Sequence, residues 1–117
     1  MTVKEFYLAI GGDYTAALAA MKSDEDILGR LRRFPDATDY AGLLPALRES
    51  RWQDALTYAA AIREDARDMC CTVLYGSADA LCRAIDGADP LGEVPPVQEK
   101  LARDYRIVVA AINGINA

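Results

Sequence analysis

The order of apolar and polar residues along the chain predicts helices throughout, with the clearest helical pattern between residues 52 and 75. Small and apolar residues recur there every three or four positions. At about 100° per residue this spacing makes one stripe on a helix, and such a stripe faces a core. The stripe consists of Ala55, Ala59, Ile62, Ala66 and Met69. Beside it a second stripe mixes apolar with basic residues, and we interpret it as a surface for a partner: Trp52, Leu56, Ala60, Arg63 and Arg67.

Three further apolar stripes mark the other long helices. One helix should end at Gly87, and its stripe consists of Leu74, Ala78, Leu81 and Ile85. The last helix should end at Gly114, and its stripe consists of Val97, Leu101, Tyr105, Val108 and Ile112. A helix capped by Thr38 should direct four side chains toward the core, those of Tyr40, Leu43, Leu44 and Leu47. Pro45 should bend this last-named helix, because proline lacks a backbone donor.

Short connections set the predicted direction of these helices. Only residues 48–51 separate the helix that follows Thr38 from the one that starts at Trp52, so the two should run antiparallel. The next turn is expected at residues 69–72. Gly76 should weaken its helix by roughly 1 kcal/mol relative to alanine, and it should let a neighbouring element come close. The Pro/Gly-rich stretch 87–96, GADPLGEVPP, should be the longest loop, with Pro95 and Pro96 at the start of the last helix.

Shorter helices are expected before residue 38. Thr2 followed by Glu5 has the form of a capping box, and its helix should end at the Gly11–Gly12 pair. Asp13 should cap a second short helix. Ser23 should cap a third, which stops at Pro35. The core positions of that third helix are Ile27, Leu28, Leu31 and Phe34.

Together these elements predict a single all-α domain over residues 1–117. The expected fold is an antiparallel up-and-down four-helix bundle from about residue 38 to 114. The short additional N-terminal helices, from about residue 3 to 34, should pack over one end of it. A chain of 117 residues is long enough to bury one core.

Composition and charge narrow the classes of function. The net charge is −5, from 13 basic and 18 acidic residues, and this balance argues against nucleic-acid binding. The basic cluster 30–33 is interpreted as a solvated face. No apolar run of 18 residues and no secretory signal is visible, so we predict no membrane span and a cytoplasmic location.

The inventory of reactive residues predicts neither a metal site nor a cofactor. Cys70, Cys71 and Cys82 lack Cys-x-x-Cys spacing, and the chain contains no histidine. We interpret the cysteines as reduced packing residues. A di-iron bundle or a nucleophilic triad would need histidine, and no phosphate-binding glycine loop follows a strand. The sequence therefore predicts a protein that is not an enzyme.

The run Ala59–Glu64, AAAIRE, resembles the active helix of histidine-containing phosphotransfer (HPt) domains, which carry Ala-His-x-Leu-Lys-Gly. The resemblance extends to the Leu74–Tyr75 opening of the next helix and to the first residues, TVKEFYLAIGGDY, so it covers most of the chain. It implies that Ala60 occupies the position of the phosphate-accepting histidine. A methyl group cannot form the reactive P–N bond, so the resemblance implies a degenerate member of the family.

Two further departures from the motif bear on a partner. Arg63 stands where the family has a lysine that helps to neutralise phosphate, and arginine could keep that role or could lie along Trp52 and Leu56. Glu64 stands where the family has glycine, and its carboxylate adds bulk and negative charge against an acidic partner. Exposed Trp52 and Leu56 would suit an interface, although a neighbouring helix could equally cover them.

Two hypotheses follow from the sequence. In the first, the chain is an HPt-like domain of a two-component phosphorelay that binds a response-regulator receiver or a histidine-kinase domain without accepting phosphate. Its partner-binding residues would be Trp52, Leu56, Ala60, Arg63, Glu64 and Arg67. In the second, it is a structural or interaction bundle without a signalling role, possible as a homo-oligomer. A transfer of phosphate through Cys70 or Cys71 is a third and minor idea.

Overall fold

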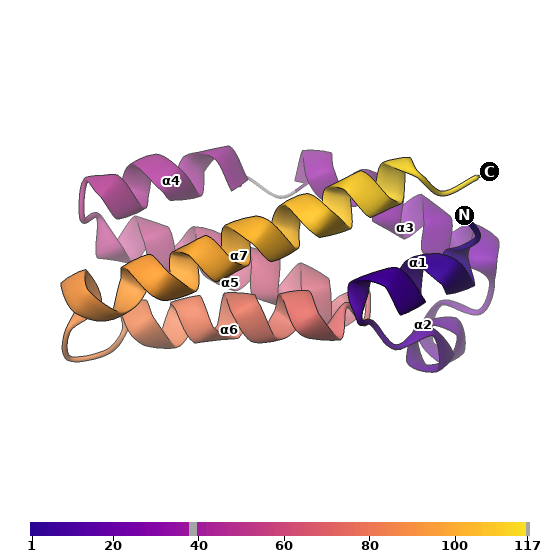
Figure 1. Cartoon of the computed structure of the whole chain (residues 1–117), viewed down its shortest axis with the longest axis horizontal. Helices are drawn as coiled ribbons and strands as arrows, with labels where there is room; N and C mark the ends of the chain where they lie inside the picture. Colours follow the sequence, from indigo (N-terminus) through magenta and orange to yellow (C-terminus); the bar gives the residue numbers. More distant parts are fainter. Residues whose placement is uncertain (38–39, 117) are drawn as a thin grey trace.

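The computed structural model describes residues 1–37 and 40–116, and every regular element in that part of the chain is an α-helix (Figure 1). The helices are, in order, α1 (Val3–Ile10), α2 (Tyr14–Met21), α3 (Asp24–Ala37), α4 (Tyr40–Arg48), α5 (Trp52–Asp68), α6 (Thr72–Ile85) and α7 (Pro90–Asn113). The predicted all-α class is thereby confirmed. None of the helices in the described ranges has the length and apolar character that a membrane crossing requires. The expected cap at Thr38 lies outside these ranges.

Helices α4 to α7 run along the longest axis of the molecule, which measures 42 Å, and alternate in direction (Figure 1). The main packing partners are α5 with α6, α6 with α7, and α4 with α5. Helices α3 and α4 follow one another along the same axis and run in the same direction (Figure 1). At 1.5 Å per residue, the 24 residues of α7 span about 36 Å, whereas the 17 residues of α5 span about 26 Å. Helices α1 and α3 cover the part of α7 that extends beyond α5 and α6.

The core is built from the predicted stripes. The five core positions of the 52–75 segment have no exposed surface: Ala55, Ala59, Ile62, Ala66 and Met69. The stripe of α6 is buried as well, through Leu74, Ala78, Leu81 and Ile85. Five other residues that were expected in the core are only partly buried: Leu28, Tyr40, Leu44, Val97 and Tyr105. All of these except Leu44 pack against the edge of the core.

Local capping follows the sequence closely. The side chain of Thr2 accepts a hydrogen bond from the Glu5 N–H at 3.1 Å, and the Glu5 carboxylate accepts one from the Thr2 N–H at 2.9 Å. Gly11 ends α1 with φ of 67°, a left-handed conformation that favours glycine. Asp13 caps α2 through the Ala16 N–H at 3.0 Å. These caps use partners within four residues, and for that reason they were predictable.

The sequence pattern predicted that a helix would end at a proline, but the structure shows that this helix continues past it. The prediction that α3 stops at Pro35 is wrong, because the helix continues to Ala37. The proline φ suits a helix, and the buried Phe34 holds this turn against Tyr105, with ring centroids 5.6 Å apart. Tyr105 also stacks on Tyr40, with centroids 4.0 Å apart, so that one side chain of α7 holds both α3 and α4.

The prediction of a long loop over residues 87–96 is also wrong. Helix α7 already begins at Pro90, and the Asp89 carboxylate caps it by accepting the Gly92 N–H at 3.2 Å. Pro95 and Pro96 lie inside the helix, and Val94, directly before them, is buried in the core. The expected close approach at Gly76 is wrong too, since a Cβ added there would meet nothing within 4 Å.

Candidate functional site

The second stripe of α5 lies on the outer wall of the molecule. Trp52, Leu56 and Ala60 are partly buried and pack against the edge of the core. Further along the helix the exposure of the side chains rises, from 30% for Arg63 to 62% for Arg67. Ala60 is therefore accessible and not sealed inside the protein. Trp52 and Leu56 are thus neither fully covered by a neighbouring helix nor fully exposed, so each of the two interpretations from the sequence is correct in part.

Ala60 lines a hollow of about 320 Å³ between α5 and α6. The two helices are antiparallel neighbours, so residues at similar distances from the turn that joins them lie at the same level. Helix α5 contributes Leu56, Ala60 and Arg63 to the hollow. Helix α6 contributes Cys82 and Arg83, and Asp86, the C-cap of α6, completes the lining. The sequence led us to expect that the helix beginning near Leu74 takes part in the docking surface. It did not identify Cys82, Arg83 or Asp86, because the helical period of one segment does not show which residues of a neighbour it will meet.

The other predicted site residues, Trp52, Glu64 and Arg67, lie on α5 outside this hollow. Arg67 lines a different hollow of about 340 Å³ at the α5–α6 turn, together with Cys70 and Tyr75 among others. Glu64 contacts both Arg63 and Arg67 and so lies between the two hollows. The six predicted residues thus follow one side of α5, and three of them, Leu56, Ala60 and Arg63, line the same hollow.

Carboxylates of the protein itself engage the arginines of this face. Arg63 lies 3.3 Å from the Glu64 carboxylate and 3.6 Å from that of Asp79 on α6. Arg67 lies 2.5 Å from Glu64, and Arg83 lies 3.0 Å from Asp79. The pKa of Arg63 is raised, chiefly by the neighbouring Cys82 and further by Glu64 and Asp79. The carboxylates of Glu64 and Asp79 therefore neutralise most of the positive charge on this face.

The thiols near the site are poor nucleophiles. Burial raises the pKa of Cys82, which is 4% exposed, and it raises the pKa of Cys71 to about 12. Burial also raises the pKa of the partly buried Cys70, and the neighbouring Asp13 and Asp68 raise it further. A thiol that stays protonated at neutral pH attacks phosphorus slowly, so these surroundings do not favour phosphate transfer through cysteine.

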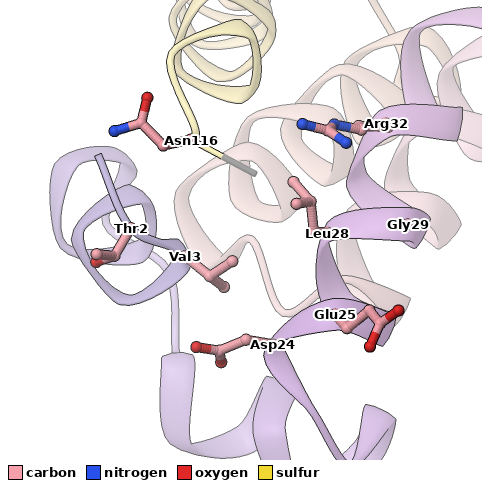
Figure 2. Close-up of a pocket in the computed structure, with 8 residues that line it drawn as sticks. All are labelled: Thr2, Val3, Asp24, Glu25, Leu28, Gly29, Arg32 and Asn116. Carbon is pink, nitrogen blue, oxygen red and sulfur yellow. The ribbon is translucent and has the colours of Figure 1, made fainter.

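A larger hollow of about 740 Å³ lies between α1, α3 and the end of the chain (Figure 2). Its residues are Thr2, Val3, Asp24, Glu25, Leu28, Gly29, Arg32 and Asn116. Figure 2 shows the side chains of Val3 and Leu28 between the carboxylate of Asp24 at one end and the guanidinium of Arg32 at the other. Sequence reasoning missed this hollow because its walls come from opposite ends of the chain.

No protein-family model matches the chain, and no curated protein or solved structure matches it. The geometry of the α5–α6 face and the motif in the sequence therefore supply the grounds for a function.

Proposed function

We propose that the chain is an HPt-like domain that cannot accept phosphate and that binds a receiver or histidine-kinase domain of a two-component system. In this proposal the fold is a four-helix bundle. Three of its helices are α5, α6 and α7, and the consecutive helices α3 and α4 together take the fourth position. Helices α1 and α2 are additions at one end. The docking surface is the outer wall of α5 together with the facing side of α6.

The observation that carries the proposal is the position of Ala60. The residue that matches the family's histidine lies at an accessible hollow on the bundle wall, flanked by Leu56 and by Arg63. A packing alanine would lie in the neighbouring stripe, where Ala59 has no exposed surface. An accessible small residue between an apolar and a charged neighbour leaves room for a side chain of a partner.

Phosphate transfer is excluded from the proposal by the residue types. Reversible phosphotransfer of this kind needs an imidazole nitrogen, and the sequence contains no histidine at any position. The role that remains is binding. Such a domain would compete with active HPt proteins for a shared receiver or would hold a kinase domain in place.

Titration of receiver domains from the same cell, followed by isothermal calorimetry, tests the binding role. Ala60→Tyr would fill the hollow and should weaken binding at least about tenfold, which corresponds to 1.4 kcal/mol. Ala61→Tyr is the matched control, because Ala61 is exposed on the next position of the same helix. Failure of every receiver and kinase domain to bind would remove the signalling role.

A gain of function tests the docking geometry separately. Ala60→His combined with Glu64→Gly restores the nucleophile and removes a carboxylate from its side. If a phosphorylated receiver that binds the protein transfers label to this variant, the position of residue 60 suits in-line transfer. A binding receiver that never labels the variant would contradict the proposed alignment of residue 60 with the histidine.

One observation favours the alternative, an interaction bundle with no signalling role. The arginines of the face are held by Glu64 and Asp79, and ordinary phosphate recognition would use unpaired cations. If this alternative holds, Ala60→Tyr should leave all two-component partners unaffected and should disrupt binding to some other protein or to a second copy. Sedimentation of the wild type beside Ala60→Tyr separates the case of self-association.

A further inference from the structure

The outer face of α3 carries acids in its first half and bases in its second half. Asp24, Leu28 and Arg32 are spaced four residues apart, so they form one row along the helix. Glu25, Gly29 and Arg33 form a second row beside it with the same spacing. The inner face of the helix is occupied by fully buried residues, namely Ile27, Leu31 and Phe34.

Each row is complementary to itself when it is reversed. When two α3 helices lie antiparallel with a two-fold axis near Leu28, Asp24 of the first copy lies opposite Arg32 of the second. By the same symmetry, Arg32 of the first copy lies opposite Asp24 of the second. The second row does the same with Glu25 and Arg33 about Gly29. Whether the centre lies at Leu28 or at Gly29, each acid meets a base, and this is the property that a two-fold interface requires.

The basic half of this face lacks an explanation within the described chain. The positive end of the helix dipole accounts for acids in the first turn, but Arg32 and Arg33 lie before the last turn of α3. No ion pair joins either arginine to residues 1–37 or 40–116. Both are exposed. By contrast Arg30, on the inner side of the same helix, is paired with Asp65 at 3.0 Å.

The surface beside these rows is hollowed and apolar at its centre. Leu28 is partly exposed and faces the hollow of about 740 Å³, whose floor includes the buried Val3 (Figure 2). Gly29 also lines it, and a Cβ added there would meet only the Arg33 guanidinium, at 3.8 Å. An apolar centre with charged residues on both sides is the usual anatomy of a protein interface, and a glycine at the centre lets two helices approach closely.

We propose that two copies of the chain associate through the outer faces of their α3 helices, antiparallel, with the two-fold axis near Leu28 and Gly29. Leu28 of each copy enters the hollow of the other, against Val3. Asp24 and Glu25 of one copy face Arg32 and Arg33 of the other. The hollow over Ala60 is formed by α5 and α6 and does not contribute to this interface, so the dimer does not depend on the proposed function and would present two such hollows.

Sedimentation equilibrium from about 10 µM to about 1 mM, a range in which moderate protein affinities are measurable, tests the dimer. The wild type should show a monomer–dimer equilibrium that weakens as salt is raised from about 0.05 to 1 M, because salt screens exposed charges. Arg32→Glu with Arg33→Glu makes the face wholly acidic and should raise the dissociation constant about tenfold or more. Arg48→Glu with Arg106→Glu is the matched control, since it changes the net charge equally at exposed sites elsewhere.

Mixing tests the antiparallel register itself. Asp24→Lys with Glu25→Lys makes a wholly basic face, which should also be monomeric alone but should form a 1:1 complex with the acidic variant. Gly29→Leu adds bulk at the centre, at a position where a Cβ would meet only the Arg33 guanidinium, so it should abolish the dimer while circular dichroism shows an intact helical fold. A wild type that stays monomeric at about 1 mM, which corresponds to less than about 4 kcal/mol of association, overturns the proposal. So does an acidic variant that dimerises as well as the wild type.

Discussion

The hydroxyl of Tyr7 donates a 2.7 Å hydrogen bond to the backbone carbonyl of Met69, 62 residues further along the chain. Tyr7 is 1% exposed and Met69 is fully buried, and the bond joins α1 to the end of α5. Burial raises the pKa of Tyr7, with a further contribution from Cys71 and Cys70. The bond thus ties the N-terminal helices to the turn that positions α5 against α6.

Tyr7→Phe should lower the free energy of unfolding by about 1–3 kcal/mol, because the Met69 carbonyl would stay buried without its donor. Urea denaturation followed by circular dichroism measures the change. Tyr14→Phe is the matched control: the Tyr14 hydroxyl donates to the Asp24 carboxylate at 2.6 Å, but on the surface, where water can replace it. Equal losses in the two variants would show that burial of the Tyr7 bond contributes nothing.

Two glycines should respond oppositely to alanine. At Gly11, φ is 67° and a Cβ would lie 2.6 Å from a methyl carbon of Val73, so Gly11→Ala should destabilise the protein by at least about 1–2 kcal/mol. At Gly76 a Cβ would meet nothing within 4 Å, so Gly76→Ala should stabilise α6 by up to about 1 kcal/mol. Thermal unfolding of both variants checks the signs. A stabilised Gly11→Ala protein would contradict the left-handed cap.

A polar cluster between α6 and α7 should make stability depend on pH. The buried Ser77 hydroxyl donates to the Asp104 carboxylate, and the Lys100 ammonium lies 2.7 Å from the same carboxylate. Burial alone would raise the pKa of Asp104, but the hydrogen bonds from Lys100 and Ser77 outweigh it and the pKa is lowered. A lowered folded-state pKa stabilises the fold above the unfolded-state pKa of about 3.9. That stabilisation disappears as the pH falls through the folded-state pKa.

Asp104→Asn should therefore be less stable than the wild type at pH 7, and the difference should shrink as the pH falls below about 4. Urea denaturation of both proteins between pH 2 and 7 measures it. Asp86→Asn is the control, because Asp86 is an exposed carboxylate at the C-terminal end of α6. A difference for Asp104→Asn that stays constant over this range would show that its carboxylate is not stabilised by the fold.

The thiols of Cys70 and Cys71 should react at different rates with iodoacetamide. Cys70 is partly buried and should be alkylated first, though more slowly than a free cysteine, because its pKa is raised. Cys71 has no exposed surface and a pKa of about 12, so it should react only after unfolding. Mass spectrometry of digests taken at pH 8, with and without denaturant, gives the order. Alkylation of Cys71 as fast as Cys70 under native conditions would contradict the buried position of Cys71.

The sequence determined the features that depend on residues close together in the chain. The capping box of Thr2 and Glu5 and the cap at Asp13 use bonds that span three residues, so their residue types and spacing suffice. The core stripe from Ala55 to Met69 was predictable for a similar reason, since the helical period alone decides which residues share a face. From the same period the stripe with Ala60 was separated from the core.

Only the tertiary structure decided which faces meet and how exposed each residue is. The continuation of α3 through Pro35 depends on Phe34 against Tyr105, a contact between residues 71 positions apart that no local pattern encodes. The hollow at Ala60 needs α6 at the right level, and the larger hollow needs the two ends of the chain side by side. Helical period is a property of one segment, whereas hollows, ion pairs such as Arg30–Asp65, and the exposure of Ala60 arise from the packing of several segments.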